Sequence, residues 1–505
     1  MSAPDIDYDD IQGLVRYGYS RLTEACFFLL AIEDRAAARA WLLGAPVTTA
    51  AERRPPPTTA LQVAFTREGL DALGVPADVV AGFSAEFAAG MAGEESRSRR
   101  LGDVGASAPA AWRWGGPGNV PHVLVMLYAG PRGLEAWTEA MKGPSWNAAF
   151  RELHRLATAD LDGFEPFGFR DGVSQPWVDW KRQRAVSERD QLEYTNEVAL
   201  GEVLLGYPNE YGKYTDRPLI DARGDSRAEL PQAEDAPDRR DVGRNGTYLV
   251  FRELSQDVRG FWQFLDAQAG SNRERRQALA EAMVGRAMSG APLIAAGGRP
   301  IAGVGTSPGD GEDARLNQFS YESDPGGLRC PLGAHIRRAN PRNADLPGRP
   351  TGLLARVVRA LGFPRGGLRS DALSSTRFHR LVRRGREYGL PLSPDHALRA
   401  AEPGDAERGL HFIGLNANIS RQFEFVQSAW IMSTKFDGLT EESDPLMGNR
   451  APIAGCPVTD TFSVPQGAGV RRRIRGIPQF VTVRGGAYFL LPGIRALRFL
   501  AGAGR

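Results

Sequence analysis

The chain has 505 residues, more than one small module needs, so it fits two or three domains or one large duplicated fold. Hydrophobic residues make up 42% of it and charged residues 24%, which are ordinary globular values and exclude extensive disorder. Lys and Arg number 62 against 60 Asp and Glu, and the resulting net charge of +2 lacks the basic excess of a nucleic-acid-binding protein. We expect no nucleic-acid partner.

The cysteines and the apolar runs bear on the compartment. Cys26, Cys330 and Cys456 are odd in number and far apart, which argues against a disulfide framework and for a reducing environment. The first residues are acidic and polar and carry no export signal, and no apolar run is long enough to cross a bilayer. We therefore expect a cytoplasmic protein without a membrane partner. The sequence leaves open whether the chain forms a homo-oligomer.

In chain order, one pattern recurs: a short apolar strand, a polar turn and an amphipathic helix. The strands are expected at 26–32, 61–65, 122–129, 247–251 and 411–417. The segment ELHRL (152–156) predicts a helix, with His154 on one face. Because strand–helix units occur in both halves, we predict an α+β fold of two similar halves, residues 1–235 and 236–505. Long Gly-, Pro- and Arg-rich loops are expected at 214–245, 289–350 and 361–377.

Common catalytic motifs are absent from the sequence. It contains no GxxxxGK[ST], HExxH or CxxC. Gly305, Ser307 and Gly309 match GxSxG, but a nucleophile elbow needs a helix that starts at the serine, and Pro-Gly-Asp-Gly follows instead. A serine hydrolase is therefore disfavoured.

Three segments combine residues that suit chemistry. In GFEPFGFRDGVSQP (163–176), Asp171 lies among aromatic residues, where a carboxylate is costly unless it is paired or functional, although Asp-Gly is also a common turn. In CPLGAHIRRANPR (330–342), His335 precedes three arginines. A neutral imidazole there can ligate iron and the arginines can pair with carboxylates, although an ordinary loop histidine would look the same. The third segment, RFHRLVRRGREYG (377–389), is an arginine cluster that also suits a solvated basic strand.

Together and in this order, the three segments resemble the dye-decolorizing peroxidase family of haem enzymes. GFRDG (168–172) matches the GxxDG signature of that family, HIRRANPR (335–342) resembles its proximal-histidine segment, and RLVRRGREYG (380–389) resembles the segment with its distal arginine. Flanking segments such as DIQGLVRYGY (10–19) and FVTVRGGAYFLLPG (480–493) are similar as well, so the resemblance covers nearly the whole chain.

The resemblance implies a duplicated ferredoxin-like α+β fold, arranged like a dimeric α+β barrel with long inserted loops, and one haem b per chain. His335 would be the axial iron ligand, Asp171 the distal acid–base residue and Arg383 the distal arginine. The remaining residues implied to contact the haem are Arg342, which would pair with a propionate, Phe169 and Gly172 of the GxxDG segment, and Leu410 and Phe412 of the apolar distal wall.

The implied activity is reduction of hydrogen peroxide coupled to oxidation of dyes or other bulky aromatic donors. A haem-binding or transport protein, an enzyme that releases iron from haem, and a cargo protein of a shell are the alternatives. Some family members carry an asparagine two residues after the distal arginine, where this chain has Gly385. The carboxylate or amide that orients His335 is left open between Asp444 and Gln479.

Overall fold

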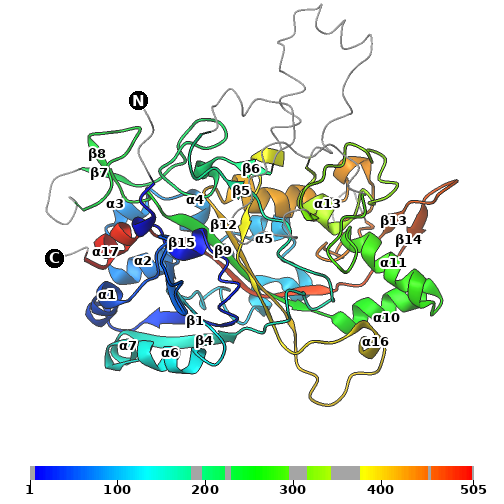
Figure 1. The fold of residues 1–505 in the computed structure, drawn as a ribbon, viewed down its shortest axis with the longest axis horizontal. Coiled ribbons are helices and arrows are strands. Elements are labelled where there is room, and N and C mark those ends of the chain that lie inside the picture. Colours follow the sequence, from blue (N-terminus) through cyan, green and yellow to red (C-terminus); the bar gives the residue numbers. More distant parts are fainter. Residues whose placement is uncertain are drawn as a thin grey trace, which may run out of the picture.

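The computed structural model describes residues 6–183, 196–221, 229–294, 316–342, 376–452 and 457–502. At its centre lies a nine-stranded sheet in which every pair of neighbouring strands is antiparallel (Figure 1). Much of the loops predicted at 289–350 and 361–377 lies outside the described residues.

Each half of the chain contributes one half of this sheet. The strands of the first half are β1 (Glu24–Ile32), β2 (Thr59–Phe65), β3 (Val123–Ala129) and β4 (Phe150–Ala157). Those of the second half are β9 (Thr247–Gln256), β10 (Val382–Arg383), β11 (Arg386–Tyr388), β12 (Gly409–Asn416) and β15 (Val481–Leu491). If β10 and β11 are counted as one broken strand, both halves have the same spatial order, second-third-first-fourth. The predicted duplicated ferredoxin-like α+β fold is confirmed.

The two half-sheets meet along two lines. On one side β15 pairs with β2 through Leu490 and Phe65. On the other side the outer strands β4 and β11 approach each other, and the amide of Ala159 donates a hydrogen bond of 2.7 Å to the carbonyl of Glu387. Among the described residues no strand ladder joins β4 to β11, so the barrel-like sheet is open there. We call this line between β4 and β11 the seam.

Helices of both halves pack against the same face of the barrel-like sheet. Those of the first half include α1 (Arg35–Gly44), α2 (Arg67–Leu73), α3 (Ala77–Val80), α4 (Ala85–Ala89), α5 (Glu95–Leu101), α6 (Leu134–Met141) and α7 (Pro144–Ala149), joined by the C-terminal α17 (Ile494–Gly502). Those of the second half include α10 (Val258–Ala269), α11 (Arg273–Val284), α13 (His335–Ala339) and α16 (Pro394–Ala397). The segments η6 (Ser420–Glu424) and η7 (Val426–Ile431) are π-helical.

Helix α10 shows why such a segment folds as it does. The side chain of Asp257 caps its first turn by accepting a hydrogen bond from the amide of Gly260, and Gly270 ends it in the left-handed region at φ +61°. Phe261, Trp262 and Leu265 are buried on the side facing the sheet. The helix predicted after strand 247–251 is confirmed.

One prediction of secondary structure is wrong: His154 lies in strand β4, not in a helix. The pairing of β1 with β4 shifts register, so that Leu29 faces His154 and Leu30 faces Glu152, and Leu153 is the extra residue of a β-bulge. Because of this extra residue, apolar side chains recur at positions 150, 153 and 156, a spacing of three that resembles a helix.

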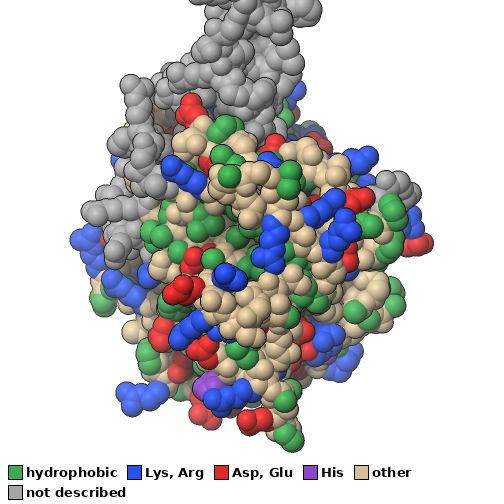
Figure 2. Space-filling model, turned by 90° about the vertical axis from the view of Figure 1, so that its right-hand side faces the viewer, with side chains coloured by type: hydrophobic (Ala, Val, Ile, Leu, Met, Phe, Trp, Pro, Cys, Tyr) green, Lys and Arg blue, Asp and Glu red, His purple; other side chains and the backbone are tan. Residues whose placement is uncertain are grey.

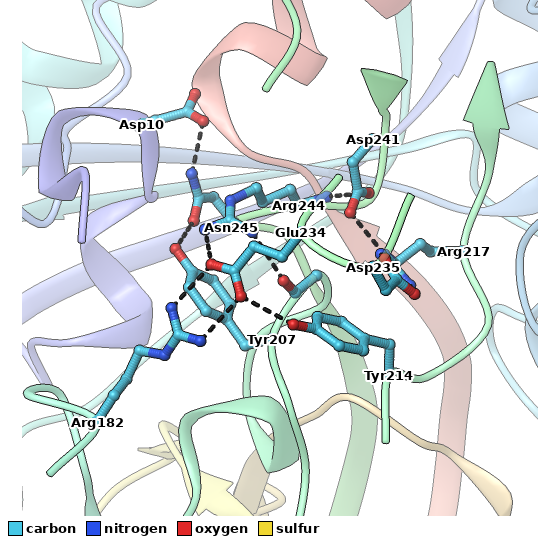
Figure 3. Close-up of polar contacts among 11 residues, drawn as sticks. Asp10, Arg182, Tyr207, Tyr214, Arg217, Glu234, Asp235, Asp241, Arg244 and Asn245 are labelled. Carbon is cyan, nitrogen blue, oxygen red and sulfur yellow. Dashed lines mark hydrogen bonds and ion pairs between the residues drawn. The ribbon is translucent and has the colours of Figure 1, made fainter. Parts of the chain in front are cut away.

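The chain between the two half-sheets forms short strands: β5 (Trp177–Val178), β6 (Glu197–Val198), β7 (Leu219–Asp221) and β8 (Arg239–Asp241). A charged network holds this part together (Figure 3). Glu234 accepts hydrogen bonds from Arg182 at 2.8 Å, Arg244 at 2.7 Å and Tyr214 at 2.9 Å. The network joins residues on both sides of the division predicted between 235 and 236, which stays a prediction.

The second half ends with the hairpin of β13 (Phe462–Val464) and β14 (Arg472–Ile474). On the face that Figure 2 shows, acidic and basic side chains are interspersed, without a large field of one sign. Within the described ranges, no helix combines the length and the apolar character that a membrane span needs.

Candidate active site

The GxxDG segment forms a tight turn after β4. Gly168 and Gly172 have φ values of +97° and +77°, which favour glycine. Inside the turn, the carboxylate of Glu165 accepts hydrogen bonds from the amides of Phe167 and Phe169, both at 3.0 Å, and from the side chain of Gln256 at 2.8 Å. Since both phenylalanine rings are buried in the core, this turn is fixed from two sides.

Asp171 and Arg383 form an ion pair at the end of this turn. Arg383 Nη1 lies 3.2 Å from Asp171 Oδ1, and Arg383 Nη2 donates to the carbonyl of Ser174 at 3.2 Å. Gln175 brackets the backbone of Arg383 with two hydrogen bonds, of 3.0 Å and 3.1 Å. The two side chains stay partly open, with exposed fractions of 32% for Asp171 and 35% for Arg383, so they can meet a small molecule.

The pKa of Asp171 results from opposing effects. Burial raises it, whereas the positive charge of Arg383, the amide of Gly172 and the hydrogen bond from Arg383 lower it, as does the charge of His335. The net result is a pKa below the ordinary value of an aspartate. Asp171 is therefore a carboxylate, able to accept a proton, over the neutral and mildly acidic range.

Strand pairing places further residues beside this pair. Arg383 lies opposite Gly414 on β12, and Glu387 opposite Leu410. Because side chains alternate along a strand, Leu410 and Phe412 share the sheet face of Arg383 and pack, half-buried, against the core. The structure therefore brings both predicted wall residues to the face that carries Arg383.

His335 is the first residue of the short helix α13. Its Nδ1 lies 2.9 Å from Oδ2 of the fully buried Asp444. Asp444 is itself fixed, because its other oxygen accepts from the amides of Leu446 at 2.9 Å and Met447 at 2.8 Å. Gln479, the alternative, donates to the carbonyl of Val481 at 2.8 Å. Asp444 is confirmed as the partner of His335.

The charges agree with this pairing. Burial lowers the pKa of His335, but the charge and hydrogen bond of Asp444 raise it by more. Burial raises the pKa of Asp444, but His335 and the neighbouring donors lower it by more. With Nδ1 held by a carboxylate, the imidazole presents Nε2, for which the described part of the chain offers no hydrogen-bond partner. That arrangement suits a metal ligand.

The arginines near His335 differ in their roles. Arg338 donates to the carbonyls of Gly333, Trp430, Ser433 and Glu442, and therefore holds the loop together. Arg337 is similarly engaged by Asp324 and by backbone carbonyls. Neither is placed as a partner for a ligand.

Arg342 and Arg286 form a buried cationic pair around Phe319. Their guanidinium carbons lie 3.8 Å and 5.2 Å from the centre of the Phe319 ring. Arg342 donates to the carbonyls of Asn317 and Phe319. Arg286 is 4% exposed, its Nη2 has no hydrogen-bond partner among the described residues, and burial together with the charge of Arg342 lowers its pKa to about 10.

A buried cation of this kind is costly unless a carboxylate pairs with it. A haem propionate is such a carboxylate, and the ring nitrogen of His335 is a suitable iron ligand. The side chains of this chain thus fit a haem: His335 for the iron, and Arg342 with Arg286 for the propionates.

The structure brings several of the predicted residues together. Asp171 pairs with Arg383 and accepts from the amide of Gly172, Leu410 and Phe412 share the sheet face of Arg383, and the charge of Arg383 acts on His335. The ring of Phe169 lies in the core, so its contact with a haem stays a prediction.

Sequence reasoning missed Glu165, Arg286 and Glu387. Glu165 precedes the GxxDG string by three residues, Glu387 lies within the arginine-rich segment 377–389 but was given no role, and Arg286 belongs to no motif. Only the fold identifies the last two, because Arg286 and Glu387 lie far in sequence from Arg342 and Asp171, the charged groups that act on them.

Comparison with known proteins agrees with this site. No model of a known protein family matches the chain. The multifunctional dye peroxidase of Amycolatopsis sp. is 30% identical, over 88% of this chain and 82% of that protein. A dye-decolorizing peroxidase of Mycetinis scorodonius is 29% identical, over 98% of this chain and 88% of that protein.

Solved structures have the same fold. The DyP-type peroxidase of Auricularia auricula-judae superposes with a TM-score of 0.70 at 25% identity, covering 99% of this chain and 100% of that one. A DyP-type peroxidase of Anabaena sp. gives a TM-score of 0.68 at 21% identity, with 98% and 94% covered, which shows the fold.

Fold, site and relatives together define a haem-dependent peroxidase, an oxidoreductase with peroxide as acceptor. The chain belongs to the dye-decolorizing peroxidase family.

Proposed function

We propose that this chain reduces hydrogen peroxide at one haem b bound through His335, and that it oxidises dyes or other bulky aromatic donors. One observation carries the proposal: the Asp171–Arg383 pair, at 3.2 Å, and the His335–Asp444 pair, at 2.9 Å, lie close enough for the charge of His335 to act on Asp171 and that of Arg383 to act on His335. A carrier needs the ligand side alone, whereas a peroxidase also needs an acid–base pair opposite it. The names of the relatives point to dyes as donors.

Each residue of the site has a separate role in the proposed reaction. The haem, when bound, supplies the iron redox chemistry. Asp171, as a carboxylate, accepts one proton from hydrogen peroxide and delivers it to the oxygen that leaves as water. Arg383 stabilises the negative charge that develops as the O–O bond breaks. Asp444 holds the proton on Nδ1 of His335 and so makes the other ring nitrogen a stronger donor to iron.

The deciding experiment removes the proposed iron ligand. His335→Ala should no longer bind haem tightly, which titration of the apoprotein with haem would measure. The variant should also no longer oxidise dye. His396→Ala is the matched control, because His396 lies on the short helix α16 and is exposed. If His335→Ala binds haem and oxidises dye like the unchanged chain, another group is the ligand. If the unchanged chain binds haem but does not consume peroxide, a carrier function is correct.

We also propose a cytoplasmic location. The support is that Cys26 and Cys330 are buried free thiols, as expected in a reducing compartment. Fractionation of cells that make the protein tests this, and activity found outside the cytoplasm would contradict it.

A further inference from the structure

Glu387 lies beside the site without any role in the mechanism above. It stands on β11 opposite Leu410, while Arg383 on β10 stands opposite Gly414. The register between them is regular, since the amide of Arg384 donates to the carbonyl of Ile413 at 2.8 Å. Arg383, Gly385 and Glu387 therefore point to the same face, and the other residues of the segment point away. Because Gly385 has no side chain, Glu387 is the next polar side chain to Arg383 on this face.

The carboxyl group of Glu387 is unusual in having few partners. The only hydrogen bond to it from the described residues comes from its own amide, and none of their cations forms an ion pair with it. By contrast, Glu165, the other carboxyl beside the site, accepts three hydrogen bonds. A carboxyl with fixed donors is suited to hold a turn, whereas one without them is suited to gain and lose a proton.

Glu387 also lies between the interior and the solvent. Its carbonyl accepts the hydrogen bond from Ala159 that crosses the seam, at 2.7 Å. Asp160, which is exposed, follows Ala159 directly in the chain. The negative charges of Asp160 and Asp171 both act on Glu387 and raise its pKa. Glu387 thus lies within electrostatic reach of both the distal carboxylate and an acidic surface residue, at the line where the sheet is open.

Burial and the neighbouring carboxylates favour the protonated form of Glu387. Burial raises its pKa, the amide of Glu387 lowers it, Asp171 and Asp160 raise it, and Arg386 lowers it, with a result of about 7. Asp171 has the opposite tendency, with a pKa below its ordinary value. One carboxyl is therefore protonated and its neighbour ionised over the same pH range, which is the arrangement of a proton donor and acceptor.

We propose that Glu387 carries protons from solvent, past Asp160 and across the seam, to Asp171. The need for such a route rests on the proposed peroxidase function. Reduction of hydrogen peroxide to two molecules of water takes up two electrons and two protons. When the donor supplies electrons only, both protons must come from solvent.

In each transfer the O–H bond of Glu387 breaks and an O–H bond of Asp171 forms, directly or through water. The negative charge moves to Glu387, which then takes a new proton from solvent. Atoms and charges balance, and the electrons come from the donor.

The kinetic test uses ferrocyanide, a donor of electrons without protons. Glu387→Gln keeps the shape of the side chain but cannot carry a proton. We expect turnover to fall about 10-fold, which is less than the full 10²–10⁴ of an acid–base residue because water also conducts protons. The fall should be larger in turnover than in the initial consumption of peroxide, which depends on Asp171. Glu387→Asp should restore part of the rate.

The control is Glu135→Gln, which makes the same charge change at an exposed position on α6 and should change neither rate. If turnover of Glu387→Gln equals that of the unchanged enzyme, the proposal is wrong. If the unchanged enzyme itself does not consume peroxide, the peroxidase function fails, which is a different result.

A second measurement does not depend on activity. Infrared difference spectra of the holoenzyme across pH should show the carbonyl band of a protonated carboxylic acid that disappears near pH 7. Glu387→Gln should remove that band, and Glu165→Gln should remove a separate one, since burial raises the pKa of Glu165 to about 7 as well. A band that persists in Glu387→Gln and vanishes only in Glu165→Gln would overturn the assignment.

Discussion

Asp171 and Arg383 show how one contact sets the working range of a catalytic group. The resemblance to the peroxidase family identified both residues, and the aromatic residues around Asp171 indicated that burial would act on its carboxylate. The sequence could not give the sign of the net effect, because the sign depends on the 3.2 Å contact and on the amide of Gly172. In the structure the effects that lower the pKa of Asp171 outweigh the effect of burial.

The pH dependence of the peroxide step follows from that sign. Asp171 acts as a base only when ionised, and its pKa lies below the ordinary value of about 3.9. The peroxide step should therefore persist through mild acid and fall only as the pH drops through that lowered pKa. Asp171→Asn should slow it about 10²- to 10⁴-fold at every pH. Stopped-flow measurement of peroxide consumption checks both statements. A loss centred near pH 6.5, the value of an imidazole, would point to a histidine base.

Asp444 gives a prediction for the other side of the site. Asp444→Asn removes the charge that orients His335 and raises its basicity, while the amide keeps the size of the side chain. We expect haem affinity or peroxidase activity to fall about 10- to 100-fold. Gln479→Ala is the control, since Gln479 bonds only the carbonyl of Val481 in the described chain and should change neither quantity. Equal losses in both variants would mean that the effect is structural.

The sequence could name His335 but could not choose its partner. Asp444 is 109 residues away and belongs to no motif that indicates its role. The pairing depends on α13 packing beside the loop that follows η7, which is a contact between distant segments. Arg286 was not predicted either, because its position beside Arg342 and Phe319 also depends on a contact between segments that are distant in the sequence.

At the scale of the element, a single residue decides what β10 and β11 can present. Gly385 stands where some family members carry an asparagine. A Cβ built there would lie 2.6 Å from the carbonyl oxygen of His411 and 3.3 Å from Cα of Phe412. Both are atoms of the neighbouring strand, so no side chain fits at Gly385 unless the strands move apart.

Gly385→Ala should therefore destabilise the fold by about 1–3 kcal/mol, the usual cost of overpacking, and should shift Arg383 away from Asp171. We expect a lower thermal midpoint and a slower peroxide step. Gly44→Ala, at the exposed end of α1, should not lower the midpoint, because among the described residues no atom outside its own stretch of helix lies within 4 Å of the new Cβ. Unchanged stability of Gly385→Ala would show that β12 yields easily and that Gly385 does not set the spacing.

Strand β4 shows where periodicity misleads. Its bulge at Leu153 gives apolar residues a helical spacing, and only the pairing with β1 reveals the strand. Strands without a bulge, such as β3 and β12, were predicted from their apolar runs. Local pattern was sufficient wherever the ladder was regular.

At the scale of the whole molecule, the duplication was predictable because strand–helix units recur in both halves. The joins between the halves were not, since one β15–β2 pair and one hydrogen bond across the seam leave no trace in the sequence. The seam nevertheless determines where Glu387 lies. Global arrangement thus places residues that no local pattern singles out.

Buried carboxyl groups also give the molecule an unusual dependence of stability on pH. Burial raises the pKa of both Glu165 and Glu387 to about 7, against about 4.3 in an unfolded chain. Between these values the folded state binds more protons than the unfolded state. The contribution of these two carboxyl groups to the free energy of unfolding should therefore decrease as the pH rises from about 4.3 to about 7. The buried His379 and His411 act in the opposite direction between about pH 4 and 6.5, because burial lowers the pKa of both to about 4.

The expected loss is on the order of 1 kcal/mol for each glutamate, because both side chains are partly exposed and solvent screens their charges. Thermal midpoints should therefore be compared between variants across this range, at equal haem content. In the double variant Glu165→Gln with Glu387→Gln, the midpoint should fall less, or rise more, with pH than in the unchanged protein. The double variant Glu135→Gln with Glu402→Gln makes the same charge change at exposed positions and should keep the pH dependence of the unchanged protein. If the midpoints of the Glu165→Gln, Glu387→Gln variant and of the unchanged protein change in parallel between about pH 5 and 7, these two carboxyl groups are ionised in the folded state, and the role of Glu387 as a proton carrier is excluded with them.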